Sequence, residues 1–257
     1  METSNDKNNK TVLGMVALEQ AIFPDVSKLI TIIEEDWQLS ASSSNYDIQD
    51  NNAVVLQIQD QIVALMFLEV PIPWEDIEPV CRSAYYWPQA SETLKKQQAH
   101  VIVSIMSDSS ALEKYQLLTK VITAVLKLTP ALAVYQGMQS LILSPERYLE
   151  ESDLLRNNSL PISLWVYFGL FTEEDETISG YTYGLNEFDK MELEVNQSNQ
   201  TLTDIYGFLY NISHYLLAYD PVLKDGETIG MTAEQKVMMT HRSSRYLEET
   251  TVIDLDF

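Results

Sequence analysis

The chain has 257 residues, of which 38 are Asp or Glu and 16 are Lys or Arg, so its formal net charge is −22. Because 46% of the residues are hydrophobic and 10% are aromatic, the composition is that of a folded protein rather than a disordered acidic tail. A folded surface this negative repels nucleic acid and anionic membranes and attracts basic proteins. We therefore expect a basic protein partner, no nucleic-acid partner and no membrane partner.

Several features of the sequence predict a cytoplasmic protein. Residues 1–10 are polar, lack the apolar stretch of a signal peptide and are expected to be disordered. No apolar run reaches about 18 residues, which a membrane-spanning helix requires. Cys81, the single cysteine, cannot form an internal disulfide and is expected to be a small half-buried apolar side chain. We predict one α+β domain over residues 11–257, with two pseudo-similar halves, 11–128 and 129–257, as an alternative.

The first part of the chain predicts the element order β-α-β-β-α-β, which is the split arrangement of ferredoxin-like folds. Apolar runs rich in β-forming residues predict its strands, and apolar residues at helical spacing predict its first helix. The expected elements are a strand over 11–20, a helix that begins at Pro24 and Asp25 and extends to Trp37, a loop over 40–52, hairpin strands over 53–59 and 62–72 around Asp60 and Gln61, a helical segment over 74–97 interrupted by Pro79 and Pro88, and a strand over 100–106.

The second part predicts further helices and a meander of strands. The expected elements are a helix over 111–128, a strand over 131–143 interrupted at Gly137, a short acidic helix over 145–157, strands over 160–171, 178–185 and 191–195, a helix over 201–219 capped by Thr201 or Thr203, and edge strands over 237–240 and 252–255. The predicted fold class is α+β, with a mixed or antiparallel sheet, a ferredoxin-like N-terminal half and helices packed on the sheet.

Six short motifs occur in a defined order along the chain. They are Pro71-Ile-Pro-Trp74, Tyr85-Tyr-Trp-Pro88, Ala99-His100, Gly184-Leu185, Met191-Glu-Leu-Glu194 and Lys224-Asp-Gly-Glu-Thr-Ile-Gly230. Through this ordered set the chain resembles, from Leu13 to about Thr240, a bacterial family described as domain of unknown function four-two-six-one. Family relatives often have two tryptophans where Tyr85 and Tyr86 stand here. The family-motif positions are Trp74, Trp87, His100, Asp225, Gly226 and Gly230.

The resemblance implies no established activity and no catalytic residue. Members of such families are sometimes encoded beside secreted bacterial toxins. An acidic cytosolic protein that caps a basic toxin domain is therefore an expectation that follows from the family association and from the charge.

No catalytic or metal-binding signature stands out in the sequence. The three histidines, His100, His214 and His241, lack the spacing of metal ligands, and we expect structural or surface roles for them. The chain contains no nucleophile elbow and no Gly-rich phosphate-binding loop. We therefore predict no metal, no cofactor and no enzymatic activity.

Three local motifs each have a structural and a functional interpretation. The alternation around Glu192 and Glu194 places both carboxylates on one face of a strand, either as a solvated face or as a metal-binding or acid–base pair. The segment 224–230 predicts either a structural turn at Asp225-Gly226 or a ligand-binding loop built from backbone groups. The tryptophans Trp74 and Trp87 are expected in the core or at its rim, or in an exposed aromatic pocket.

The densest run of charge is Glu173-Glu174-Asp175-Glu176, which we expect at the tip of a hairpin. Twelve acidic residues lie between Glu146 and Glu194, against Arg147, Arg156 and Lys190. A solvated loop is one interpretation of the hairpin. The other is a binding surface for a basic partner, because tyrosine supplies rigid contact area and carboxylates pair with Arg and Lys. The residues predicted to bind the partner are Glu173, Glu174, Asp175, Glu176, Tyr181, Tyr183, Glu192 and Glu194.

The leading hypothesis is thus an acidic cytosolic binding protein that neutralises a basic protein partner, such as an immunity protein that blocks a bacterial toxin or effector. A regulatory or ligand-binding module of unknown partner is the alternative. An enzyme that uses Glu192 and Glu194 is a further alternative, and mimicry of nucleic acid is a variant of the leading hypothesis.

Overall fold

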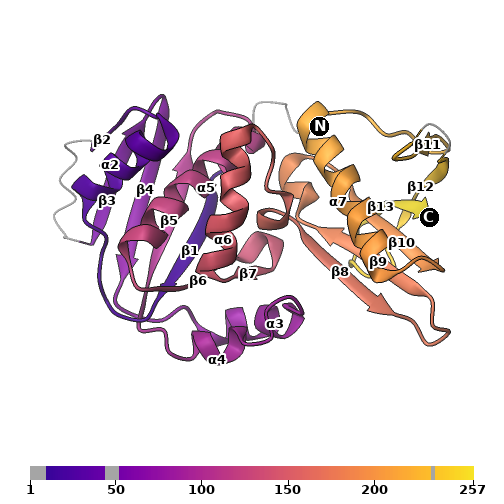
Figure 1. Cartoon of the computed structure of the whole chain (residues 1–257), viewed down its shortest axis with the longest axis horizontal. Coiled ribbons are helices and arrows are strands. Elements are labelled where there is room, and N and C mark those ends of the chain that lie inside the picture. The colour runs from indigo at the N-terminus through magenta and orange to yellow at the C-terminus, as the bar shows by residue number, and fades with distance from the viewer. Residues whose placement is uncertain (1–9, 44–51, 233–234) are drawn as a thin grey trace. The chain divides into compact units, whose positions relative to one another are not determined.

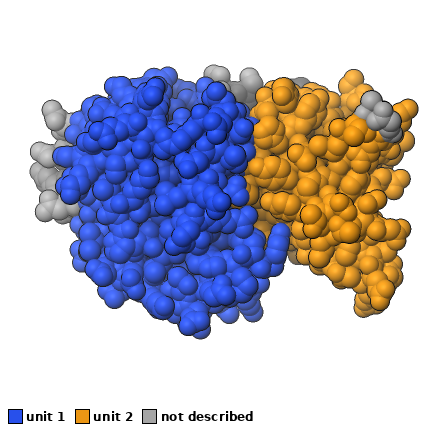
Figure 2. Space-filling model, in the orientation of Figure 1, with its two compact units in different colours: residues 1–161 blue, residues 162–257 orange. Residues whose placement is uncertain are grey.

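The computed structural model describes residues 10–43, 52–232 and 235–257. The chain divides into two compact units, residues 1–161 and 162–257, each of which is described by itself (Figures 1 and 2). Each unit contains one mostly antiparallel sheet together with helices, so the predicted α+β class is confirmed. A single domain over 11–257 stays a prediction. The predicted disordered N-terminus, apart from Lys10, and residues 44–51 of the predicted loop lie outside the described residues.

Residues 1–161 form a seven-stranded antiparallel sheet with the strand order β2-β3-β4-β5-β1-β6-β7. The strands are β1 (Val12–Leu18), β2 (Ala41–Ser43), β3 (Ala53–Ile58), β4 (Gln61–Leu68), β5 (Ala99–Met106), β6 (Ala131–Gln136) and β7 (Leu141–Leu143). The predicted hairpin is present as β3 and β4, and β4 lies inside the sheet but ends before Ile72. Beyond it the backbone N–H and C=O of Ile72 pair with the side-chain amide of Gln97, at 3.1 and 3.0 Å, instead of with a strand.

The ferredoxin-like arrangement of this unit is not confirmed. The predicted elements occur in the predicted chain order, although the segment predicted as a loop contains the short strand β2. In the sheet, β5 lies between β4 and β1. Two strands, β4 and β5, therefore lie between β1 and β3, whereas a split β-α-β unit has one strand between the pair that its helix connects. The element order was visible in the sequence, and the order of the strands in the sheet was not.

Three helices of this unit begin at side chains that cap their free N–H groups. Asp25 caps the first helix, Ser110 forms a capping box with Glu113, and Ser144 precedes a helix that begins at Pro145. The helices are α2 (Val26–Trp37), α3 (Trp74–Ser83), α4 (Ala90–Leu94), α5 (Ala111–Leu128) and α6 (Pro145–Ser152), with 3-10 turns η1 (Gly137–Gln139) and η2 (Asp153–Asn157). The predictions of α2 and α5 are confirmed.

Helices α3 and α4 cover one end of the sheet face that lies opposite α5. Their apolar side chains pack against Ala17 and Ala133 of the sheet. The sequence predicted that Pro79 and Pro88 both interrupt the helical segment. Only the second break is present, because Pro79 lies inside α3 and the chain leaves helical geometry between α3 and α4.

Residues 162–257 form a six-stranded sheet with the strand order β11-β12-β13-β10-β9-β8 and one long helix. The strands are β8 (Tyr167–Thr172), β9 (Ile178–Tyr183), β10 (Glu192–Ser198), β11 (Thr228–Ile229), β12 (Val237–Ser243) and β13 (Thr251–Asp256). The helix is α7 (Leu202–Tyr219), and 3-10 turns form η3 (Ile162–Leu164) and η4 (Leu185–Phe188). Thr201 caps α7 through a capping box with Asp204, as the sequence predicted for the first of its two candidate caps.

In this unit α7 lies across one face of the sheet (Figure 1). Its buried side chains include Ile205 and Leu209, which lie against Gly180 of β9. Side chains alternate along a strand, so Tyr181 and its cross-strand partner Glu194 point to the opposite face. The unit therefore has an apolar face under α7 and a second face that carries polar and aromatic side chains.

Two predictions for the C-terminal strands are wrong. Strands β12 and β13 were both expected at edges, but both lie inside the sheet. Strand β12 pairs with β11 and β13, and β13 pairs antiparallel with β12 and parallel with β10. A parallel pairing between segments this far apart leaves no local mark in the sequence. Strand β8 begins at Tyr167 rather than at residue 160, because residues 162–164 form a 3-10 turn. Within the described part of the chain, no helix is long and apolar enough to cross a bilayer.

Candidate functional site

The acidic run lies at the tip of the β8–β9 hairpin, as the sequence predicted. Strands β8 and β9 pair from Tyr167 with Tyr183 to Thr172 with Ile178. The side chains of Glu174, Asp175 and Glu176 are exposed at the turn. The Asp175 carboxylate accepts hydrogen bonds from the N–H and the hydroxyl of Thr177, at 3.2 and 2.5 Å, and these bonds lower its pKa.

Glu173 does not join the exposed carboxylates of the tip. Its Oε1 accepts hydrogen bonds from the hydroxyls of Ser179, at 2.6 Å, and Tyr246, at 3.1 Å. The carboxylate therefore points toward the polar face of the sheet and links the hairpin to the loop between β12 and β13. Three of the four carboxylates in the run remain directed to solvent.

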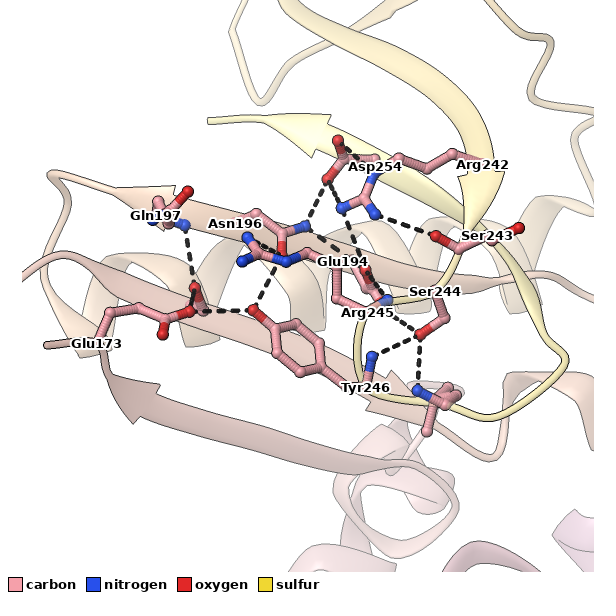
Figure 3. A network of polar contacts seen from close by, with 12 residues as sticks. Glu173, Glu194, Asn196, Gln197, Arg242, Ser243, Ser244, Arg245, Tyr246 and Asp254 are labelled. Atoms are coloured by element: carbon pink, nitrogen blue, oxygen red, sulfur yellow. Dashed lines mark hydrogen bonds and ion pairs between the residues drawn. The ribbon is translucent and has the colours of Figure 1, made fainter.

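A network of polar side chains centres on Glu194, which is 0% exposed (Figure 3). Its Oε2 lies 3.3 Å from Nη2 of Arg242 and 3.4 Å from the backbone nitrogen of Arg245. The Ser244 hydroxyl donates a hydrogen bond to the other oxygen. Arg242 also contacts Asp254, with Nε 2.9 Å from Oδ2. The buried negative charge is thus matched by one guanidinium and by neutral donors, as burial of a carboxylate requires.

The network holds the loop between β12 and β13 against the sheet. The Ser244 hydroxyl oxygen accepts hydrogen bonds from the backbone nitrogens of Tyr246, at 3.0 Å, and Leu247, at 2.8 Å. The Tyr246 ring stacks on Tyr181, with centroids 5.4 Å apart, and meets Phe171 edge-on at 5.0 Å. Burial raises the pKa of Tyr181. Tyr181 is therefore part of a packed aromatic row, beneath the loop.

Glu192 is also buried and serves the local backbone. Its carboxylate accepts hydrogen bonds from the Thr182 hydroxyl at 2.7 Å, from the Gly184 nitrogen at 2.8 Å and from the Asn186 nitrogen at 3.1 Å. These bonds satisfy the first N–H groups of the η4 turn. Burial is the largest influence on this group and raises its pKa above the ordinary value of 4.5, although the hydrogen bonds oppose the shift.

The raised pKa of Glu192 predicts a pH-dependent contribution to stability. The folded state keeps this proton to a higher pH than the unfolded state, so the free energy of unfolding falls as pH rises from about 4.5 through the folded-state pKa, and then levels. The substitution Glu192→Gln removes this titration. Urea denaturation between pH 4 and pH 7 should show wild type losing stability relative to the variant as pH rises. A difference that does not change with pH would contradict the assignment.

The structure therefore does not place Glu192 and Glu194 on a solvated face or in an open catalytic site. Both are on one face of β10, as the alternation predicted, yet they are 2% and 0% exposed, and neighbouring groups occupy their oxygens. Neither carboxylate is presented to a partner at the surface. In the described residues, no three His, Cys, Asp or Glu side chains gather in a way that could hold a metal ion.

The remaining predicted positions do not gather at this site. In the N-terminal unit, Trp74 and Trp87 are partly buried against the cluster under α3 and α4, and Nδ1 of His100 lies 2.8 Å from the carbonyl of Val70. Tyr183 is half-buried on β9. In the C-terminal unit, Asp225 and Gly226 form the predicted tight turn, which lies beside β12.

Sequence reasoning missed four residues of the network: Arg242, Ser244, Tyr246 and Asp254. Their contacts depend on the register of β12, β13 and β10, which pair segments far apart in the chain. The sequence did contain one signal for these residues. Basic residues are scarce in this half of the chain, and Arg242 and Arg245 lie only three positions apart.

A comparison with known protein families finds a match within the C-terminal unit. Residues 181–256 match the model of a family described as a domain of unknown function (DUF4261), which confirms the resemblance over this segment. The segment contains the Glu192 and Glu194 strand, the network around Arg242 and the turn at Asp225 and Gly226. The motifs in the N-terminal unit lie outside the matched residues. No curated protein and no solved structure matches the chain.

Proposed function

We propose that this chain is an acidic cytoplasmic binding protein that neutralises a basic protein partner, as an immunity protein blocks a bacterial toxin domain. The observation that carries the proposal is the charge of the C-terminal unit. Residues 162–257 contain 17 Asp and Glu against five Lys and Arg. A surface with this excess attracts a basic partner over long range and raises the rate of association.

The negative charge of this unit is largely exposed. Within the described residues its exposed carboxylates are Glu174, Asp175, Glu176, Asp189, Asp204, Asp220, Asp225, Glu227, Glu248, Glu249 and Asp256. They are spread over the hairpin tip, both ends of α7, the turn before β11 and the C-terminal strands. The charge therefore supplies attraction rather than a single docking point, and apolar anchors would have to hold the complex.

Three of the five basic side chains of the unit lie beside its own carboxylates. Arg242 pairs with Glu194 and Asp254, Lys190 pairs with Asp220, and Lys224 lies 3.8 Å from Glu227. The closer pairs of Arg242 and Lys190 leave these two charges poorly placed to repel a cationic partner.

Reversal of charge at the hairpin tip tests the proposal. We expect the double substitution Glu174→Lys, Glu176→Lys to slow association with the partner about tenfold at low salt and to flatten the dependence of the rate on salt. The partner is the protein retained by the tagged chain in its native host, and stopped-flow fluorescence gives the rate. Glu173 is left unchanged because its carboxylate holds the hairpin.

The matched control is Glu34→Lys, Glu35→Lys, which changes two exposed residues of α2 and alters the net charge by the same amount. We expect a smaller decrease from this control. If both double variants slow association equally, only net charge matters and the hairpin is not part of the docking surface. If neither changes the rate, electrostatic attraction does not operate.

A further inference from the structure

The C-terminal unit contains a surface pocket of about 580 Å³ beside the last turns of α7. Its walls come from α7, from the segment 221–223, from β11 and from Met239 of β12. Most of the lining side chains are apolar, and Asn211, Glu227 and Thr228 are the polar exceptions. The volume lies in the range of ligand-binding pockets, and the exposed wall is mixed, because polar atoms contribute to it beside the apolar side chains.

Large apolar side chains around this pocket are open to solvent. Tyr215 is 41% exposed, Met231 is 49% exposed and Val222 is 79% exposed. The ring of Tyr219, 73% exposed, lies next to that of Tyr215, with centroids 5.6 Å apart. Single exposed apolar residues are ordinary, but a cluster at the mouth of a pocket marks an interaction site.

The charge at the pocket favours a partner segment that carries Lys or Arg beside the side chain that enters the pocket. Glu227 lies in the wall, and none of the described residues that line the pocket is Lys, Arg or His. Lys224 lies 3.8 Å from Glu227, but the two side chains are 71% and 52% exposed, so this pair is weak and another cation can replace Lys224. The exposed tyrosine rings are additional sites for a Lys or Arg side chain.

The edge of the pocket is fixed by backbone contacts. Gly226 takes φ +77° at the turn, and its nitrogen donates to the Met239 carbonyl at 2.9 Å. The Met239 nitrogen donates to the Glu227 carbonyl, also at 2.9 Å, and Asp225 accepts a bond from the His241 nitrogen. The segment predicted as a turn or a ligand-binding loop thus holds one wall of the pocket in place through its own hydrogen bonds.

We propose that this pocket receives an aliphatic or aromatic side chain from a Lys- and Arg-rich segment of the basic partner. The inference rests on the proposed function and names the place where the complex is anchored. Long-range attraction brings the partner to the unit, and burial of one apolar side chain beside Glu227 holds it there.

The test uses methyl signals of the methionines as local probes. The probe ligand is a 12-residue peptide of Lys and Leu, and the control peptides replace Lys by Glu or Leu by Ser. With ¹³C-methyl methionine in the full chain, we expect the Lys-Leu peptide to shift the signals of Met231 and Met239. The signals of Met15 and Met66, in the other unit, should stay in place. Neither control peptide should shift the two pocket signals.

Substitutions separate the pocket from the charge. Tyr215→Ser should weaken binding of the Lys-Leu peptide about tenfold by fluorescence anisotropy. Leu202→Ser, which changes another exposed apolar residue of α7 away from the pocket, should leave it within about twofold. Thermal melts confirm that both variants fold.

Saturating peptide that leaves the Met231 and Met239 signals unchanged overturns the inference. So does binding that Tyr215→Ser does not weaken. Either result leaves the proposed function standing if the native partner still associates in a salt-dependent way. If association with the native partner does not depend on salt, the proposed function itself is contradicted.

Discussion

The substitution Gly169→Ala should lower the free energy of unfolding by about 2–3 kcal/mol, because a methyl group at this position overlaps the Tyr181 ring. A Cβ built on Gly169 would lie 2.2 Å from Cε1 of Tyr181, its direct cross-strand partner. The ring cannot move away freely, since Tyr246 stacks on it and ties it to the loop between β12 and β13. Urea denaturation followed by circular dichroism measures the loss.

Gly207→Ala is the matched control for this prediction. Gly207 lies within α7, and a Cβ there would meet no atom within 4 Å. Alanine has the higher helix propensity, so the control should raise the free energy of unfolding by about 0.5–1 kcal/mol. Opposite signs for the same chemical change are expected. A stabilising Gly169→Ala would contradict the packing of Tyr181 on β8.

The second large effect is expected at Glu194. Alanine at this position leaves Arg242 without one of its two carboxylate partners and removes the acceptor that the Ser244 hydroxyl uses. Breaking a buried pair costs about 3–5 kcal/mol, and the partial exposure of Arg242, 28%, places Glu194→Ala at about 3 kcal/mol. The free energy of unfolding from urea titrations gives the value.

Two controls define the cause of that loss. Asp256→Ala removes an exposed carboxylate from the neighbouring strand β13 and should change stability by no more than about 0.5 kcal/mol. A double-mutant cycle with Arg242→Ala should give a coupling energy above about 0.5 kcal/mol, because the two side chains share a network. Additive effects would mean that Glu194 and Arg242 do not interact in solution.

The polar network separates the carboxylates of the C-terminal unit into a group that makes internal contacts and a group that is exposed. The carboxylates of Glu173, Glu192 and Glu194 make hydrogen bonds within the protein. They therefore stabilise the C-terminal unit rather than contact a partner. The exposed charge comes instead from side chains such as Glu174, Glu176 and Glu227. Substitutions in the first group should change stability, and those in the second should change association, which lets experiments separate folding from binding.

The sequence predicted the local features of the fold well. Helices α2, α5 and α7 follow from apolar spacing, and Asp25 and Thr201 mark the starts of α2 and α7 within one helical turn. The β8–β9 hairpin follows from a short charged segment between two apolar runs. All of these signals are local, so a single sequence contains them.

The sequence did not predict features that depend on distant pairing. The order of strands in both sheets, the interior position of β13 and the contact of Arg242 with Glu194 join segments far apart in the chain. The alternation of Glu192 and Glu194 predicted their shared face but not their burial, since burial comes from η4 and from the loop that contains Ser244 and Tyr246. The pocket beside α7 likewise depends on where the segment 224–230 meets β12.

The most direct test of the proposed binding function is recovery of the partner from the native host with a tagged form of this chain. We expect one basic protein in a stoichiometric amount, released by salt because Coulomb attraction between exposed charges is screened. Expressed alone, that protein should stop growth of a test host, and co-expression with this chain should restore it. Recovery of no stoichiometric protein, or of an acidic one whose association is insensitive to salt, would contradict the account.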